Sequence, residues 1–323
     1  MEIINSSKKY DFVKVGKYFF GLSILAFTLS LALFLTKGLN YGIDFSGGTV
    51  IQAQYSQNAP IDAIREALQP SPYFKGASVT KFGSDNEIII KTPTSDSSVD
   101  EDMGDLANAL LKNTGEYEIR RVDMVGPKVG KELKEKGLTA LALAMVAIMI
   151  YVGIRFEWRF ALAAIIALFH DIIITTGFLS LLGTDVNLDT VAALLTILGY
   201  SINDTIIVFD RIREIVRENR ISSLGEIINV AVSNTLPRTI LTSLTTFFVV
   251  LTLYLFGGEI ITGFSLPLLI GIIIGTYSSI FVASVLLMVL KFDVKSYREA
   301  EAQGEKRKKE KERIRAMYEK GVV

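Results

Sequence analysis

The sequence has no cysteine, a single histidine and no excess of either charge, and each scarcity excludes a class of function. Without cysteine there is no disulfide framework, thiolate nucleophile or thiolate metal ligand. One histidine cannot build a multi-histidine metal site. Lys and Arg together number 34, as do Asp and Glu, so the cationic excess typical of nucleic-acid binders is missing. We therefore expect no metal, no other cofactor and no nucleic-acid partner.

The chain is instead rich in long apolar runs that carry almost no charge. At about 1.5 Å of rise per residue, each run is long enough to cross a bilayer. The first run follows several lysines, as a secretion signal would, but it is too long for one and lacks a small-residue cleavage site, so it should be retained. The runs predict a polytopic α-helical membrane protein with six transmembrane helices, at 18–36, 138–154, 160–182, 188–209, 240–257 and 264–290.

The distribution of basic residues predicts how these helices are oriented. Lys and Arg lie between spans two and three, between spans four and five, and after residue 290, whereas the connections 183–187 and 258–263 contain none. Positively charged connections stay in the cytoplasm. We therefore expect a cytoplasmic N-tail and first helix (1–37), an extracytoplasmic domain (38–137), five further helices (138–291) and a charged cytoplasmic tail (292–323) whose basic residues attract membrane lipid.

The long external segment has the pattern of a small folded domain. Alternating and β-branched residues predict strands, whereas two stripes of apolar residues at helical spacing predict helices. The expected order is βαββαβ, an α+β ferredoxin-like arrangement, although a fold of this kind does not reveal its function. The elements are strands at 49–55, 79–82, 87–91 and 117–125, and helices at 61–68 and after Ser97 and Ser98 through 103–111.

Four charged or titratable residues lie inside the apolar runs. His170 and Asp171 are in the middle of span three, Asp204 is in the inner half of span four, and Arg238 is at the inner start of span five. A charge inside a membrane costs about 3 kcal/mol on insertion scales, so each of these residues needs a structural or functional explanation.

Helical spacing extends this group to two polar faces. Residues three, four, seven and eight positions apart share one side of a helix, so the polar side chains of spans four and five are expected to line a common interior beside the alanines of span three. The supporting residues are Thr196, Tyr200 and Asn203 around Asp204, and Thr242 and Thr246 after Arg238.

Two interpretations of these residues stay open. Asp204 is either a proton-binding carboxylate with Arg238 as a movable counter-charge, or one half of a static salt bridge whose arginine reaches the headgroups. His170 is a possible proton relay because its unperturbed pKa is near 6.5, but a neutral histidine hydrogen-bonded between helices is the simpler explanation. For Asp171, a relay and an interhelical contact are equally compatible with the sequence.

Glycines cluster at the two ends of the external domain. Glycine accepts positive φ angles, so these clusters predict turns or hinges. Gly271 and Gly275 in span six instead predict close helix packing, and no Gly-Lys-Ser/Thr sequence follows any of the clusters, so we expect no ATP binding. The hinge or turn residues are Gly42, Asp44, Gly47 and Gly48 after span one, and Gly126 and Pro127 before span two.

Four of these segments together resemble the SecF family: 42–48, 125–127, 199–211 and 238–243. The resemblance implies a protein-export subunit of the bacterial (cytoplasmic) inner membrane, related to the RND superfamily, that pairs with a SecD-like partner subunit. It implies that this SecDF pair assists the SecYEG translocon and uses the proton-motive force to promote export and release of the translocating preprotein on the outer face. The family's acidic residue of span four and arginine of span five correspond to Asp204 and Arg238, which makes both candidates for proton flow.

Other classes of function remain as alternatives. One is a non-conducting structural subunit that stabilises SecD or the channel through its polar helix faces. Another is an RND-like half-transporter for small or lipidic molecules, although such proteins usually have larger external domains. We do not expect an enzyme, because no pairing of a nucleophile with a base is visible.

Overall fold

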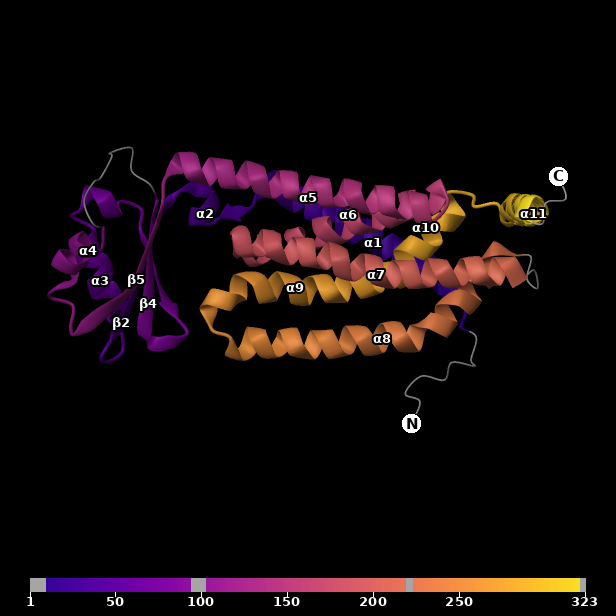
Figure 1. Cartoon of the computed structure of the whole chain (residues 1–323). Helices are drawn as coiled ribbons and strands as arrows, with labels where there is room; N and C mark the ends of the chain where they lie inside the picture. The colour runs from indigo at the N-terminus through magenta and orange to yellow at the C-terminus, as the bar shows by residue number, and fades with distance from the viewer. Residues whose placement is uncertain (1–9, 94–102, 219–222, 320–323) are drawn as a thin grey trace.

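The computed structural model describes residues 10–93, 103–218 and 223–319. A long helical bundle carries a smaller α+β domain at one end (Figure 1). In the described residues six helical segments are long and apolar enough to cross a membrane, which confirms the predicted number of spans. They are α1 (Phe12–Thr36), α5 (Pro127–Arg155), α6 (Trp158–Leu182), α7 (Leu188–Glu218), α8 (Leu224–Phe256) and the segment Ile261–Val289.

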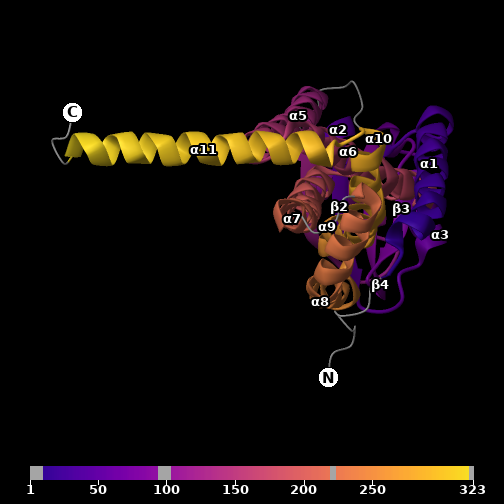
Figure 2. The same cartoon turned by 90° about the vertical axis from the view of Figure 1, so that its right-hand side faces the viewer.

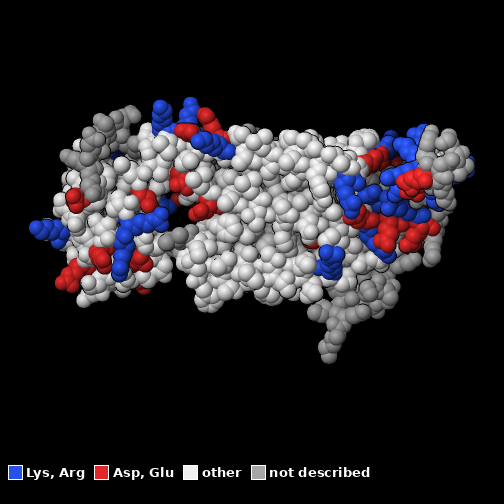
Figure 3. Space-filling view, in the orientation of Figure 1, with Lys and Arg blue, Asp and Glu red and all other residues white. Residues whose placement is uncertain are grey.

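On the face shown in Figure 3, the charged side chains gather at the two ends of the molecule and leave an almost uncharged band across the bundle. Such a band is what the hydrocarbon core of a bilayer requires, because ionised groups are strongly disfavoured there. The protein is therefore a multi-pass membrane protein.

Several helices are longer than the apolar runs that predicted them. Helix α5 begins at Pro127 instead of residue 138, α8 begins at Leu224 instead of residue 240, and α7 continues to Glu218. Charged residues such as Glu, Lys and Arg are good helix formers, so a helix does not end where its apolar run ends. The sixth span is divided into α9 (Glu259–Ser278), a π-helical turn η2 (Ser279–Ala283) and α10 (Ser284–Val289).

Helices α6, α7 and α9 form the centre of the bundle. Within an 18-residue apolar stretch of each span, the share of buried positions is 61% for α6, 50% for α7 and 56% for the sixth span, but only 11% for α1 and α5 and 17% for α8. Glycines allow α9 to approach α7 closely: a Cβ atom added at Gly271 would lie 2.2 Å from Ile197. The expected packing role of this glycine is therefore visible in the structure.

The α+β domain contains a four-stranded sheet in which every neighbouring pair is antiparallel, in the order β3-β4-β2-β5. Alternate residues of β2 and β4 pack on α3 and α4, which cover the side of the sheet away from the bundle (Figure 1). The chain order βαββαβ is as expected, while Ser97 and Ser98 lie outside the described residues. The elements are β2 (Gly48–Tyr55), α3 (Ile61–Leu68), β3 (Ser78–Phe82), β4 (Ser84–Pro93), α4 (Met103–Leu111) and β5 (Tyr117–Val125), with a short 3-10 turn η1 (Pro72–Phe74) after α3.

Three short elements connect this domain to the bundle. The sequence predicted a turn after the first span and a short connection at 183–187 in their place. Strand β1 (Asn40–Tyr41) pairs in parallel with β6 (Asp185–Val186), and the four-residue helix α2 (Ile43–Ser46) follows β1. Strands of two residues have no recognisable periodicity, and β1 finds its partner more than a hundred residues away. Sequence patterns therefore could not reveal them.

The charged tail forms one long helix, α11 (Val294–Glu319), at the end of the bundle opposite the domain (Figure 1). It lies across the long axis of the bundle and projects away from it (Figure 2). Its first turns are attached to α7: Arg217 and Glu301 form an ion pair at 2.5 Å, and Arg213 Nε donates to the Tyr297 hydroxyl at 3.0 Å.

Candidate functional site

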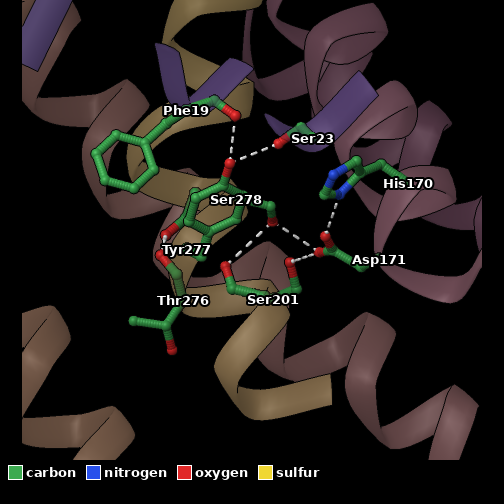
Figure 4. A network of polar contacts seen from close by, with 10 residues as sticks. Phe19, Ser23, His170, Asp171, Ser201, Thr276, Tyr277 and Ser278 are labelled. Carbon is green, nitrogen blue, oxygen red and sulfur yellow. Dashed lines mark hydrogen bonds and ion pairs between the residues drawn. The ribbon is translucent and has the colours of Figure 1, made fainter. Parts of the chain in front are cut away.

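A buried polar cluster joins the three central helices (Figure 4). Asp171 of α6 is fully buried. Its Oδ2 atom accepts hydrogen bonds from Ser201 Oγ of α7 at 2.6 Å and from Ser278 Oγ of α9 at 2.8 Å. Its Oδ1 atom lies 2.9 Å from Nδ1 of the neighbouring His170. A single carboxylate thus contacts donors on all three helices.

His170 is buried beside this carboxylate and uses one ring nitrogen to reach it. Its other ring nitrogen, Nε2, is also buried and has no hydrogen-bond partner in the described structure. His170 therefore contacts the Asp171 carboxylate through Nδ1, while Nε2 makes no hydrogen bond to the described residues.

Sequence patterns did not single out the serines of this cluster, because the candidate site was built from charged residues and the larger polar side chains beside them. Ser278 stands directly before the π-helical turn η2, a wider turn that often marks functional sites. Ser201 packs against Gly275, where an added Cβ atom would lie 3.0 Å from the serine side chain. The available signal was the succession of small residues Gly271, Gly275 and Ser278 at helical spacing, which indicates a close approach to a neighbouring helix.

Asp204 lies one helical turn after Ser201 on α7 and is 2% exposed. Its Oδ2 atom is buried and has no hydrogen-bond partner in the described structure. Two residues of α8 act on this carboxylate: Ser243 through its hydroxyl group and Arg238 through its charge alone. Unlike the carboxylate of Asp171, this one has a buried oxygen that remains free.

Arg238 lies on α8 directly after Pro237 and is exposed on the outside of the chain. It makes no hydrogen bond to the buried oxygen of Asp204. One interpretation of the sequence was a static salt bridge between these two residues, and this structure lacks its contact to that oxygen. Proline within a helix removes one backbone hydrogen bond and favours a kink. The arginine therefore stands at a point where α8 is locally weakened.

The expected polar faces do not all point into the common interior. On α7, Thr196 and Asn203 are exposed and Tyr200 is half-buried, although Asp204 itself is buried. Neighbouring helical residues point about 100° apart, so Asn203 and Asp204 cannot share one direction. On α8, Thr242 and Thr246 are half-buried and donate to backbone carbonyl groups of their own helix at 2.9 Å. The expectation of one shared polar interior was wrong for Thr196 and Asn203.

The glycine loop after α1 is packed between the domain and the bundle. A Cβ atom at Gly42 would lie 1.8 Å from Asn187, and Gly47 and Gly48 have φ angles of +75° and +145°. Asp44 Oδ2 accepts a hydrogen bond from the backbone N–H of Leu188 at 3.0 Å. These residues thus form a turn with close contacts on both sides.

The second glycine segment has a different environment. Gly126 precedes α5 with no atom within 4 Å of a Cβ atom placed there, and Pro127 occupies the first turn of α5. Proline suits this position because the first N–H groups of a helix are unpaired in any case. Within the described residues, no group of three His, Cys, Asp or Glu side chains is arranged to hold a metal ion.

Comparison with known proteins identifies the family. The profile "Protein export membrane protein SecD/SecF, C-terminal" matches residues 106–293, and the profile "SecD/SecF GG Motif" matches residues 32–59. The chain belongs to the SecF family. It is 48% identical to the protein translocase subunit SecF of Helicobacter pylori strain 26695 over 323 residues, which is 100% of both chains. It is 43% identical to SecF of Escherichia coli O157:H7 over 90% of this chain and 91% of that one.

Solved structures of SecDF have the same fold. SecDF from Thermus thermophilus, described as a translocon-associated membrane protein, superposes with a TM-score of 0.80 and is 36% identical, over 88% of this SecF-family chain and 39% of that chain. SecDF in its super-membrane-facing form gives a TM-score of 0.67 at 33% identity, over 94% of this chain and 41% of the other. The chain thus spans about two fifths of a SecDF chain, and the resemblance seen in the sequence is confirmed.

Proposed function

We propose that this protein is the SecF half of a SecDF unit that uses the proton-motive force to promote preprotein export and release on the outer face of the membrane. Since the chain matches only 39% of the Thermus thermophilus SecDF chain, the remainder is left for a SecD-like partner subunit. That relative is described as translocon-associated, which supports an association of this protein with the SecYEG translocon. The bacterial relatives support a location in the bacterial inner membrane, and the alternation of basic connections supports a cytoplasmic position of both termini.

The observation that carries the proposal is the environment of Asp204. This carboxylate is buried at membrane depth, has an oxygen without a hydrogen-bond partner, and is influenced by the charge of an arginine that does not directly pair with that oxygen. Protonation removes the attraction between Asp204 and Arg238, so that α7 and α8 repack and displace the extracytoplasmic domain. A charge that crosses 100 mV releases about 2.3 kcal/mol, enough to bias two states about 50-fold.

The other polar residues receive different roles in this proposal. Asp171, supported by His170, holds α6, α7 and α9 together. A proton relay through these two residues is the second possibility, and substitutions at Asp171 and His170 in the same export experiment would test it. Thr196 and Asn203 are exposed at membrane depth, where polar groups favour contact with another protein over contact with lipid. Their exposure supports a partner subunit along α7.

The test replaces Asp204 by Asn in the full complex with its partner, reconstituted with the translocon in vesicles. The substitution keeps the shape but removes the proton-binding group, so we expect proton-dependent stimulation of export to disappear while the complex still assembles. Asp210→Asn on the same helix is the matched control, because the side chain of Asp210 is 41% exposed and its carboxylate lies 3.3 Å from Arg155 and 3.5 Å from Arg213. Wild-type stimulation by Asp204→Asn would refute the proposal.

A non-conducting structural subunit is the second candidate, and the cluster around Asp171 favours it because its hydrogen bonds serve to join helices. On that hypothesis, Asp204→Asn and bulky substitutions at Gly271 should have the same effect, namely loss of assembly with the partner. Loss of stimulation with intact assembly distinguishes the proton-coupled function from the structural one.

A further inference from the structure

Contacts made by Asp44, Lys91 and Asp185 attach the outer end of α7 to the extracytoplasmic domain. The proton site at Asp204 does not itself account for these contacts. We propose that Asp44 and the ion pair between Lys91 and Asp185 are positioning residues, which make the domain and the helix that carries Asp204 move as one body. This inference rests on the proposed function, since it concerns how the proton site acts on the domain. It differs from a flexible hinge in the loop 42–48.

The first contact is a helix cap supplied from a distant part of the chain. Asp44 of α2 accepts a hydrogen bond from the N–H of Leu188, the first residue of α7, at 3.0 Å. The first four N–H groups of a helix have no partner within the helix, and a carboxylate there also interacts favourably with the helix dipole. Asp44 therefore holds the start of α7 through both a hydrogen bond and its charge.

The second contact is made by the backbone. Strands β1 and β6 pair through Tyr41 and Val186, and the N–H of Gly42 donates to the Val186 carbonyl group at 3.0 Å. A Cβ atom added at Gly42 would lie 1.8 Å from Asn187 Oδ1, so a side chain at this position would require Asn187 to move. The segment that precedes α2 and the segment that precedes α7 are thus in direct contact.

The third contact comes from the sheet itself. Lys91, near the end of β4, forms an ion pair with Asp185 of β6, just before α7. Gly48 begins β2 beside Thr92 of β4, where an added Cβ atom would lie 2.5 Å from a backbone oxygen. The loop with Asp44 and the strand with Lys91 are therefore parts of one packed unit.

Helix α7 connects these contacts to the proton site. Leu188 and Asp204 lie on the same uninterrupted helix, and their separation of 16 positions corresponds to about 24 Å at 1.5 Å per residue. A helix packed on its neighbours over that length shifts as a rigid element. A displacement of α7 at Asp204 therefore reaches the residues that Asp44 and Lys91 hold.

A cross-link distinguishes attachment from a hinge. The sequence has no cysteine, so Lys91→Cys with Asp185→Cys introduces the only thiols of this chain, and a short, reducible bis-thiosulfonate reagent can join them in the full complex. Without the reagent, loss of the ion pair should reduce proton-dependent stimulation, and cross-linking should restore it. Inhibition by the cross-link that reduction reverses would establish a hinge and overturn the proposal, as would full stimulation without the reagent.

Substitution of Asp44 tests the cap with a readout that needs no proton gradient. Asp44→Asn keeps an oxygen that can accept from Leu188, whereas Asp44→Ala does not. We expect Asp44→Ala to speed amide hydrogen exchange in the first turn of α7 about fivefold and to reduce stimulation by a similar factor. Asp44→Asn keeps the hydrogen bond and loses only the charge, so it should lie much closer to the wild type. Asp62→Ala is the matched control, because Asp62 lies in the first turn of α3 with its side chain 94% exposed.

The outcomes separate this inference from the proposed function. If Asp204→Asn abolishes stimulation but Asp44→Ala leaves stimulation at the wild-type level, the attachment has no role in coupling and only this inference fails. If Asp204→Asn leaves stimulation unchanged, the proposed function fails, whatever Asp44→Ala does to hydrogen exchange. Faster exchange together with reduced stimulation, both reversed in Asp44→Asn, supports the inference.

Discussion

Gly271→Ala tests the contact between the two central helices that position the candidate site. The added Cβ atom would lie 2.2 Å from Cδ1, 2.3 Å from Cγ1 and 3.0 Å from Cγ2 of Ile197. Carbon atoms in good contact are about 3.5–4.0 Å apart, so the new methyl group overlaps most of the isoleucine side chain. Ile197 is 1% exposed and belongs to a buried cluster with Leu194 and Ile272. It therefore has no open space into which to move.

Overpacking of this kind destabilises a protein by about 1–3 kcal/mol, and we expect a loss of stability in this range when the variant is denatured by heat in detergent with its partner bound. Ile197→Ala alone should cost about 2–5 kcal/mol, because it leaves a cavity. In the double variant the methyl group at position 271 occupies part of that cavity. The destabilisation by Gly271→Ala should therefore disappear in the Ile197→Ala background.

Gly21→Ala is the matched control, because no atom lies within 4 Å of a Cβ atom at this position in α1. Alanine is the better helix former, so this variant should be at least as stable as the wild type. The reasoning would be refuted if Gly271→Ala denatured like the wild type, or if the two losses simply added in the double variant. Either result would mean that α7 and α9 are not in close contact at this point.

Two further predictions concern single carboxylates. The backbone N–H of Lys14 and the amide of Asn229 hold the pKa of Asp11 below its ordinary value of 3.8. Asp11→Ala should therefore lower the melting temperature above pH 3.8. The difference in melting temperature between this variant and the wild type should vanish as the pH falls through the lower pKa of the folded state. Asp171→Ala leaves the Ser201 hydroxyl without its partner, a loss of about 1–3 kcal/mol for each orphaned group, whereas Asp171→Asn keeps an acceptor; thermal denaturation that is equal in the two variants would contradict this role.

The sequence was sufficient for the elements whose formation depends on local composition. An apolar run becomes a membrane span wherever it lies, because transfer into the bilayer depends on the residues of that run, and all six spans were predicted in this way. The elements of the α+β domain followed from periodicity alone: the helix predicted at 61–68 is α3, and the strand at 117–125 is β5. A charge such as Asp204 within an apolar run is equally visible, since it disturbs a composition that is otherwise uniform.

Only the tertiary structure decided how these elements meet. Sequence spacing put Asn203 and Asp204 on one polar face, but packing buries the second and leaves the first exposed. The serines that bind Asp171 and the aspartate that caps α7 belong to segments more than 25 residues from their partners. Such contacts depend on which helices become neighbours, and no local pattern specifies this. The sequence determined which segments cross the membrane and where the unusual charges lie; long-range packing determined which of those charges are paired.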